Sequence, residues 1–153
     1  MIEERIGTIL RRKKKTLALA ESCTGGLVSD RVTDVPGSSG YFAGGIIAYS
    51  NEAKISELGV PPGTIKKYGA VSREVAKAMA EGAKWVFSAD LAASITGIAG
   101  PTGGTKNKPV GLAYIAFCSK KKCRTRKVLF KGDRRTLKEK FAEAVLKLME
   151  DNA

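Results

Sequence analysis

The segment TLALAESCTGG, Thr16–Gly26, joins a short apolar run to a polar turn that ends in two glycines. The run TLALA is typical of a buried strand, and the stretch CTGGLVSDRVTDV carries apolar side chains at helical spacing. Strands that alternate with helices indicate an α/β protein, in which ligands bind beyond the carboxyl ends of the strands. The segment therefore predicts an α/β fold and makes the end of its first strand a candidate site.

The chain on both sides of this segment extends the alternation. Apolar spacing and turn residues predict helices over residues 1–13, 23–35, 51–59, 72–87 and 133–150, and strands over 16–20, 42–50, 90–96, 110–119 and 123–131. Residues 60–71 and 97–109, rich in Pro and Gly, are expected to be connections. The early strands should pair in parallel and the last two as a hairpin. We expect a three-layer α/β/α sandwich with a mixed, mostly parallel five-stranded sheet, in a single domain over residues 1–153.

Capping residues and apolar stripes place three of these helices more closely. Asn51 and Ser72 are expected N-caps, and Gly59 is an expected helix stop. The apolar stripes expected to face the core are Val75, Met79, Ala83 and Val86 in one helix, and Leu137, Phe141, Val145 and Leu148 in the last.

The charge balance indicates the kind of partner. The 153 residues include 27 Lys and Arg against 15 Asp and Glu, a net charge of +12. Such a chain attracts phosphorylated small molecules, nucleic acids or anionic membranes. No apolar run approaches the ~20 residues of a membrane span, and residues 1–15 lack the apolar core of a signal peptide. We expect a cytoplasmic protein without membrane association.

The absence of histidine restricts the chemistry that the chain can perform. It excludes Ser-His-Asp triads and Cys-His pairs, and it removes the commonest zinc ligand, so no metal site is expected. The three cysteines, Cys23, Cys118 and Cys123, are too few for a disulfide framework. Whether Cys118 and Cys123 pair across their hairpin stays open. A catalytic base would have to be Lys, Tyr, Asp or Glu.

Three polar segments follow three of the predicted strands: ESCTGG, YSNEAK and TGIAGPTGG. Because strand ends meet at one edge of a parallel sheet, we expect one pocket there. Ser22 and Thr24 are typical helix caps, Cys23 is typical of a small buried residue, and Lys54 of a solvated lysine. Alternatively, Ser22 is a nucleophile and Lys54, with its pKa lowered by desolvation, is its base.

Six ordered stretches between Thr16 and Arg134 carry a family resemblance: TLALAESCTGGLVSDRVTDVPGSSGYFAGGIIAYSNEAK, LGV, YGAVS, ASITGIAGPTGG, KPVGLAYIA and GDR. Together they resemble the C-terminal domain of the CinA family, which also occurs as the stand-alone nicotinamide-nucleotide amidase PncC. The resemblance implies a three-layer α/β/α fold and hydrolysis of the carboxamide of nicotinamide mononucleotide to nicotinate mononucleotide and ammonia. It implies no cofactor.

Residue by residue, the resemblance implies a Ser/Lys catalytic pair at Ser22 and Lys54, with Tyr49 as a third catalytic residue. The expected substrate-binding residues, from the resemblance and from the strand-end argument together, are Glu21, Thr24, Gly25, Gly26, Thr96, Gly97, Gly100, Gly103 and Arg134. This chain departs from the family at Lys138, where a second arginine is common, and lysine lacks the bidentate fork of arginine.

Three functions are compatible with the sequence. The first is the amidase, a small enzyme that binds a nucleotide and is expected to self-associate. The second is a non-catalytic nucleotide-binding or regulatory module with the same fold. The third is a nucleic-acid-binding protein, which the net charge suggests but which the lack of aromatic residues among the basic runs disfavours.

Overall fold

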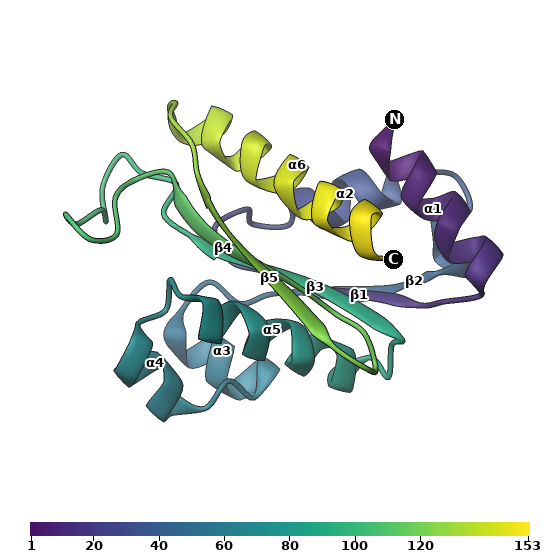
Figure 1. Ribbon diagram of the computed structural model, residues 1–153, viewed down its shortest axis with the longest axis horizontal. Coiled ribbons are helices and arrows are strands. Elements are labelled where there is room, and N and C mark those ends of the chain that lie inside the picture. The colour runs from purple at the N-terminus through teal and green to yellow at the C-terminus, as the bar shows by residue number, and fades with distance from the viewer.

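The computed structural model describes all 153 residues and consists of one five-stranded sheet between two layers of helices (Figure 1). The helices are α1 (Ile2–Lys13), α2 (Leu27–Thr33), α3 (Asn51–Leu58), α4 (Pro62–Tyr68), α5 (Arg73–Val86) and α6 (Arg134–Asn152), with a short 3₁₀ turn at Ser38–Gly40. The strands are β1 (Leu17–Glu21), β2 (Phe42–Ile47), β3 (Leu91–Gly97), β4 (Leu112–Cys118) and β5 (Cys123–Leu129). None of the helices has the length and apolar character needed to span a bilayer.

The sheet has the strand order β2-β1-β3-β4-β5. Strands β2, β1 and β3 are parallel, whereas β4 is antiparallel to both of its neighbours. Four of the five strands therefore run in one direction, and the predicted three-layer mixed sheet is confirmed. The carboxyl ends of β1, β2 and β3 lie at one edge, where the three polar segments begin.

Each face of the sheet has its own apolar core. Helices α1, α2 and α6 cover one face, and α3, α4 and α5 cover the other (Figure 1). Strands β1 and β3 lie between both layers and are buried along nearly their whole length, as expected for central parallel strands. Edge strand β2 alternates between half-buried and exposed side chains. The expected core side chains of α6 are all buried: Leu137, Phe141, Val145 and Leu148.

Four local expectations are corrected by the structure. Residues 62–68 form α4 instead of a connection, since Pro at the first turn of a helix sacrifices no hydrogen bond. Helix α2 begins at Leu27 and not at Cys23, because Gly25 and Gly26 adopt positive φ angles that a helix cannot continue. The N-cap of α3 is Ser50, whose hydroxyl accepts from the Ala53 N–H, and not Asn51.

The fourth correction concerns α5, whose cap is as predicted but whose stripe is shorter. The Ser72 hydroxyl accepts from the Val75 N–H, and Gly59 ends α3 with a left-handed conformation, both as expected. Val86, however, is 49 % exposed, so the buried stripe of α5 ends at Ala83, one turn earlier than predicted. Cys118 and Cys123 are opposite each other in the β4–β5 ladder and form a disulfide, which answers the question left open by the sequence.

The contact between α3 and α5 depends on a glycine. A Cβ atom on Gly82 of α5 would overlap the carbonyl oxygen of Leu58, the last residue of α3. Only a residue without a side chain lets the two helices approach so closely. Since α3 carries Lys54, this contact also sets the depth of Lys54 beside the sheet.

We predict that Gly82→Ala destabilises the protein although alanine is the better helix former. Overpacking typically costs about 1–3 kcal/mol, which outweighs the roughly 1 kcal/mol that alanine gains in helix propensity. Urea unfolding followed by circular dichroism measures the change. The control is Gly63→Ala in α4, where a Cβ would meet no atom within 4 Å and stability should stay the same or rise. A Gly82→Ala protein as stable as Gly63→Ala would contradict the close packing.

Candidate active site

Ser22 and Lys54 are in direct contact although they are 32 positions apart in the chain. Ser22 follows β1, and its backbone N–H donates to the Ile95 carbonyl of β3 at 3.1 Å, which fixes the residue against the sheet. Lys54 lies in the second turn of α3, which begins after β2. Its Nζ donates to Ser22 Oγ at 3.1 Å and to the Tyr49 carbonyl at 3.3 Å. The structure thus brings together a hydroxyl and an amine from two adjacent strand ends.

Lys54 is a buried lysine without an ionic partner. Its side chain is 2 % exposed, and no carboxylate lies within salt-bridge distance of its Nζ. Burial lowers the pKa of Lys54, because a charged ammonium loses its hydration there, while the nearby Cys23 acts weakly in the opposite direction. A lysine with a lowered pKa can accept a proton from a neighbouring hydroxyl.

Cys23, next to Ser22, does not have the properties of a nucleophile. Its side chain is 5 % exposed, and burial raises the pKa of the thiol to about 12. The thiolate is the reactive form of cysteine, so this thiol is held in its unreactive form. The interpretation of Cys23 as a small packing residue fits this environment.

A cavity of about 320 Å³ opens beside the pair. Residues from the three parallel strand ends and the start of α6 line it: Ser22, Cys23, Tyr49, Asn51, Lys54, Ala70, Val71, Thr96, Gly97, Ile98, Ala99, Gly100, Thr102, Gly103 and Arg134. Six further predicted site residues line the same cavity as this pair: Tyr49, Thr96, Gly97, Gly100, Gly103 and Arg134.

Arg134, the first residue of α6, joins two walls of this cavity. Its Nη1 donates to the Gly100 carbonyl at 2.7 Å, and its Nη2 donates to the Tyr49 hydroxyl at 2.9 Å. A guanidinium has five N–H donors, so three remain for a ligand. The Tyr49 hydroxyl therefore contacts Arg134 and not Lys54; only the Tyr49 carbonyl meets Lys54. The catalytic role that the resemblance implies for Tyr49 is therefore not accompanied by a direct contact between its hydroxyl and Lys54.

The remaining cavity residues serve mainly to shape it. The Thr96 hydroxyl, buried, donates to the Ala70 carbonyl at 2.9 Å and so ties β3 to the α4–α5 connection. A Cβ on Gly97 would lie 2.6 Å from the Ala113 Cβ, which explains this glycine by strand packing. Gly100 and Gly103 have positive φ angles within the loop that follows β3. These glycines let the loop turn around the cavity.

Four predicted binding residues lie outside this cavity. The buried Glu21 carboxylate accepts four hydrogen bonds, from the Thr24 hydroxyl at 2.6 Å, the Val28 N–H at 2.9 Å, and the N–H and hydroxyl of Ser29 at 2.9 and 2.7 Å. Glu21 is thus the residue that caps α2, a role that the sequence assigns to Ser22 or Thr24. The Glu21 carboxylate and the Thr24 hydroxyl are thus engaged with each other and with the start of α2.

Gly25 and Gly26 face a separate depression of about 280 Å³, which Arg135 and Lys138 also line. This depression shares no residue with the cavity beside Ser22. The substitution of lysine for the second family arginine at Lys138 therefore falls outside the candidate active site. Sequence reasoning missed Asn51 and Val71, which line the cavity. Their signal was available, since each lies in a segment that carries the family resemblance.

Comparison with known proteins agrees with the motifs. The model of the CinA C-terminal domain matches residues 1–153. A putative competence-damage inducible protein of Halothermothrix orenii is 54 % identical over 134 residues, which are 87 % of this chain and 32 % of that protein. One from Caldicellulosiruptor saccharolyticus is 49 % identical over 148 residues, 97 % of this chain and 36 % of that protein. The chain thus spans about a third of the length of these relatives.

Solved structures show the same fold. The competence/damage inducible protein CihA from Agrobacterium tumefaciens superposes with a TM-score of 0.94 at 35 % identity, over 97 % of this chain and 91 % of that chain. The competence damage-inducible protein A from Klebsiella pneumoniae superposes with a TM-score of 0.95 at 27 % identity, over 99 % and 94 % of the two chains. By its sequence from end to end, the chain belongs to the CinA C-terminal domain family.

Proposed function

We propose that this chain hydrolyses the carboxamide of nicotinamide mononucleotide to nicotinate mononucleotide and ammonia, with Ser22 as nucleophile and Lys54 as base. The observation that carries the proposal is the contact of 3.1 Å between Lys54 Nζ and Ser22 Oγ in a buried position without a competing carboxylate. Only an unpaired, desolvated lysine is readily neutral near pH 7, and only a neutral lysine can activate serine. The substrate is inferred from the family resemblance of the motifs.

In the proposed first half-reaction, neutral Lys54 takes the proton of Ser22 as Oγ attacks the carboxamide carbon. Cys23 directly follows Ser22 and lines the same cavity, so its backbone N–H is the donor we assign to the oxyanion. The Lys54 ammonium then gives its proton to the departing nitrogen. Ammonia leaves, and the nicotinoyl group remains as an ester of Ser22.

In the second half-reaction, a water molecule attacks this ester while Lys54 accepts one of its protons. The Lys54 ammonium then returns the proton to Ser22 Oγ as the carboxylate product leaves. The phosphate of the substrate would find the free N–H donors of Arg134 at the cavity mouth, and the net charge of +12 would attract it. No step needs a metal or an organic cofactor.

Ser22→Ala should lower ammonia release from nicotinamide mononucleotide by roughly 1,000-fold or more, as removal of a nucleophile does in serine hydrolases. The matched control is Cys23→Ala at the neighbouring position, which should keep activity within a few-fold because the thiol is buried and protonated. Ammonia is measured with a coupled assay. Wild-type activity in Ser22→Ala, or its loss in Cys23→Ala alone, would overturn the assignment of the nucleophile.

The rate should rise with pH as Lys54 loses its proton, and it should level off below the ordinary pKa of lysine. Lys54→Met, which keeps the length of the side chain, should lower kcat by about 10²–10⁴-fold and abolish this rise.

The lowered pKa of Lys54 also affects stability. The unfolded chain binds the Lys54 proton more tightly than the folded chain does, so Lys54 makes stability increase with pH between its pKa in the folded chain and its pKa in the unfolded chain. Lys54→Met should therefore unfold no more easily than wild type, which separates loss of the base from loss of the fold.

The preference among nicotinamide mononucleotide, nicotinamide riboside and nicotinamide tests the substrate. We expect kcat/KM to be about 10–100-fold higher for the nucleotide than for the riboside, the value of one charge-assisted contact to phosphate. Arg134→Gln should remove most of this difference. If no amide is hydrolysed but calorimetry shows binding of nicotinamide mononucleotide, the chain is the non-catalytic module instead.

A further inference from the structure

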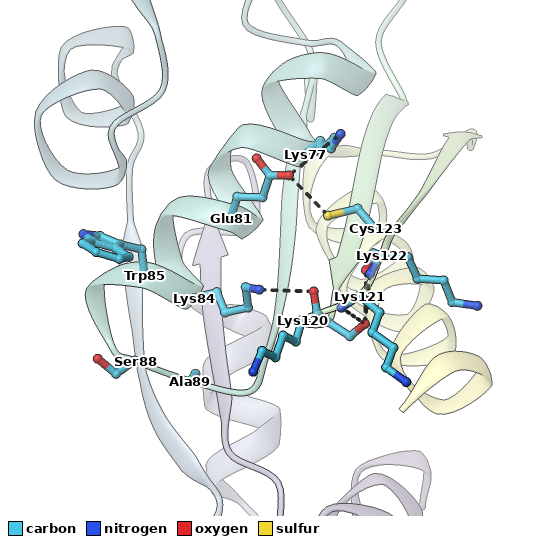
Figure 2. Close-up of a pocket in the computed structure, with 11 residues that line it drawn as sticks. Lys77, Glu81, Lys84, Trp85, Ser88, Ala89, Lys120, Lys121, Lys122 and Cys123 are labelled. Carbon is cyan, nitrogen blue, oxygen red and sulfur yellow. Dashed lines mark hydrogen bonds and ion pairs between the residues drawn. The ribbon is translucent and has the colours of Figure 1, made fainter.

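A group of possible metal ligands lies near the tip of the β4–β5 hairpin: Cys118, Cys123 and Glu81. None of the three lines the cavity beside Ser22. Cys118 and Cys123 face α5, where Cys118 packs among the buried residues of that layer. Glu81 of α5 points toward Cys123 (Figure 2). The two sulfurs and a Glu81 oxygen all lie within 4.8 Å of one another. We propose that, once the disulfide is reduced, Cys118, Cys123 and Glu81 form a tetrahedral site for a zinc-class divalent cation.

The distances fit such an ion. Zinc binds thiolate sulfur at about 2.3 Å and carboxylate oxygen at about 2.1 Å, so at the tetrahedral angle a sulfur and an oxygen ligand are about 3.6 Å apart. Cys123 Sγ and Glu81 Oε1 are 3.6 Å apart. Two thiolates on one zinc are about 3.8 Å apart by the same geometry, so the two sulfurs, which are bonded to each other in the disulfide, must move apart once it is reduced.

The surroundings supply access and a fourth ligand. A cavity of about 640 Å³ lies beside the group and opens between α5 and the hairpin tip (Figure 2). Cys118 is buried, Cys123 half-buried and Glu81 exposed, so an ion can enter from the Glu81 side and keep a water in its fourth position.

The charges around the group are compatible with a metal bound by thiolates. Two thiolates and one carboxylate give Zn²⁺ a net charge of −1, and ammonium groups border the cavity: Lys77, Lys84, Lys120, Lys121 and Lys122. Neighbouring cations favour the thiolate form of cysteine. Lys77 Nζ pairs with Glu81 Oε1 at 3.9 Å, but both side chains are about half exposed, and such a pair is weak enough to yield.

The disulfide and the metal exclude each other, since a sulfur bonded to its partner is no longer a thiolate. A dithiol reductant supplies two electrons and two protons to the disulfide, is itself oxidised to a disulfide, and leaves Cys118 and Cys123 as thiols. The cation then displaces the two thiol protons. Metal loading of this site would thus report the redox state of its surroundings, independently of the amidase reaction.

Cobalt titration of the full chain tests the site, because tetrahedral Co²⁺ bound by thiolates absorbs strongly in the visible region. Protein reduced with a phosphine and kept free of oxygen should bind one Co²⁺ with these bands, and Zn²⁺ should displace it. Oxidised protein should show none. Glu81→Gln should weaken binding at least about tenfold, and Cys123→Ser should abolish the thiolate bands.

The matched controls are Glu74→Gln, an exposed glutamate of the same helix, and Cys23→Ala, the third cysteine; both should bind cobalt like wild type. Circular dichroism checks that Cys123→Ser is folded. If Cys123→Ser does not fold, Glu81→Gln still tests the site, because Glu81 is exposed and its substitution leaves the core unchanged. Absence of the bands in reduced wild type would overturn the proposal. So would unchanged affinity in Glu81→Gln, or equal loss in Glu74→Gln.

Discussion

The candidate site depends on one costly arrangement, an amine buried next to a hydroxyl with no anion to neutralise it. Lys54 is 2 % exposed and meets only neutral oxygens, those of Ser22 and of the Tyr49 carbonyl. Burial of an ammonium is expensive, and the amine escapes that cost by giving up its proton. The fold must therefore hold Lys54 in place without an ion pair, and the close contact of α3 with α5 at Gly82 contributes to this.

A carboxylate beside Lys54 would stabilise its charged form, and Glu21 is the nearest carboxylate in the sequence to Ser22. In the structure, Glu21 is hydrogen-bonded to other groups. It lies directly before Ser22, yet its oxygens accept four hydrogen bonds from Thr24, Val28 and Ser29 at the start of α2. These donors satisfy the hydrogen-bonding capacity of the carboxylate and hold it toward α2, which covers the face of the sheet opposite to α3 and Lys54 (Figure 1). The same segment, ESCTGG, thus holds an anion that stabilises a helix and a hydroxyl that stays available.

Much of this was accessible from the sequence because it follows from periodicity and strand order. Apolar spacing predicted the layers, the convergence of strand ends predicted one shared pocket, and the family resemblance implied that Ser22 and Lys54 form a pair. Other features depend on backbone direction, which residue types do not encode. Glu21 lies six positions before the first residue of α2, outside the usual capping positions, and Pro61 and Pro62 of the α4 segment are typical of turns as well. The path of the chain between β2 and α3 determines that the Tyr49 carbonyl, and not the Tyr49 hydroxyl, contacts Lys54.

The hydrogen bonds of Arg134 have a consequence for the order in which the site is assembled. Ser22, Lys54 and the loop after β3 all precede residue 112, whereas Arg134 opens the last helix and joins Tyr49 to Gly100 across the cavity. During synthesis from the N-terminus, the reactive pair therefore emerges well before the wall that closes around it. Completion of the cavity wall is tied to the docking of α6, so a chain interrupted before residue 134 would contain Ser22 and Lys54 but lack the residue that joins Tyr49 to Gly100.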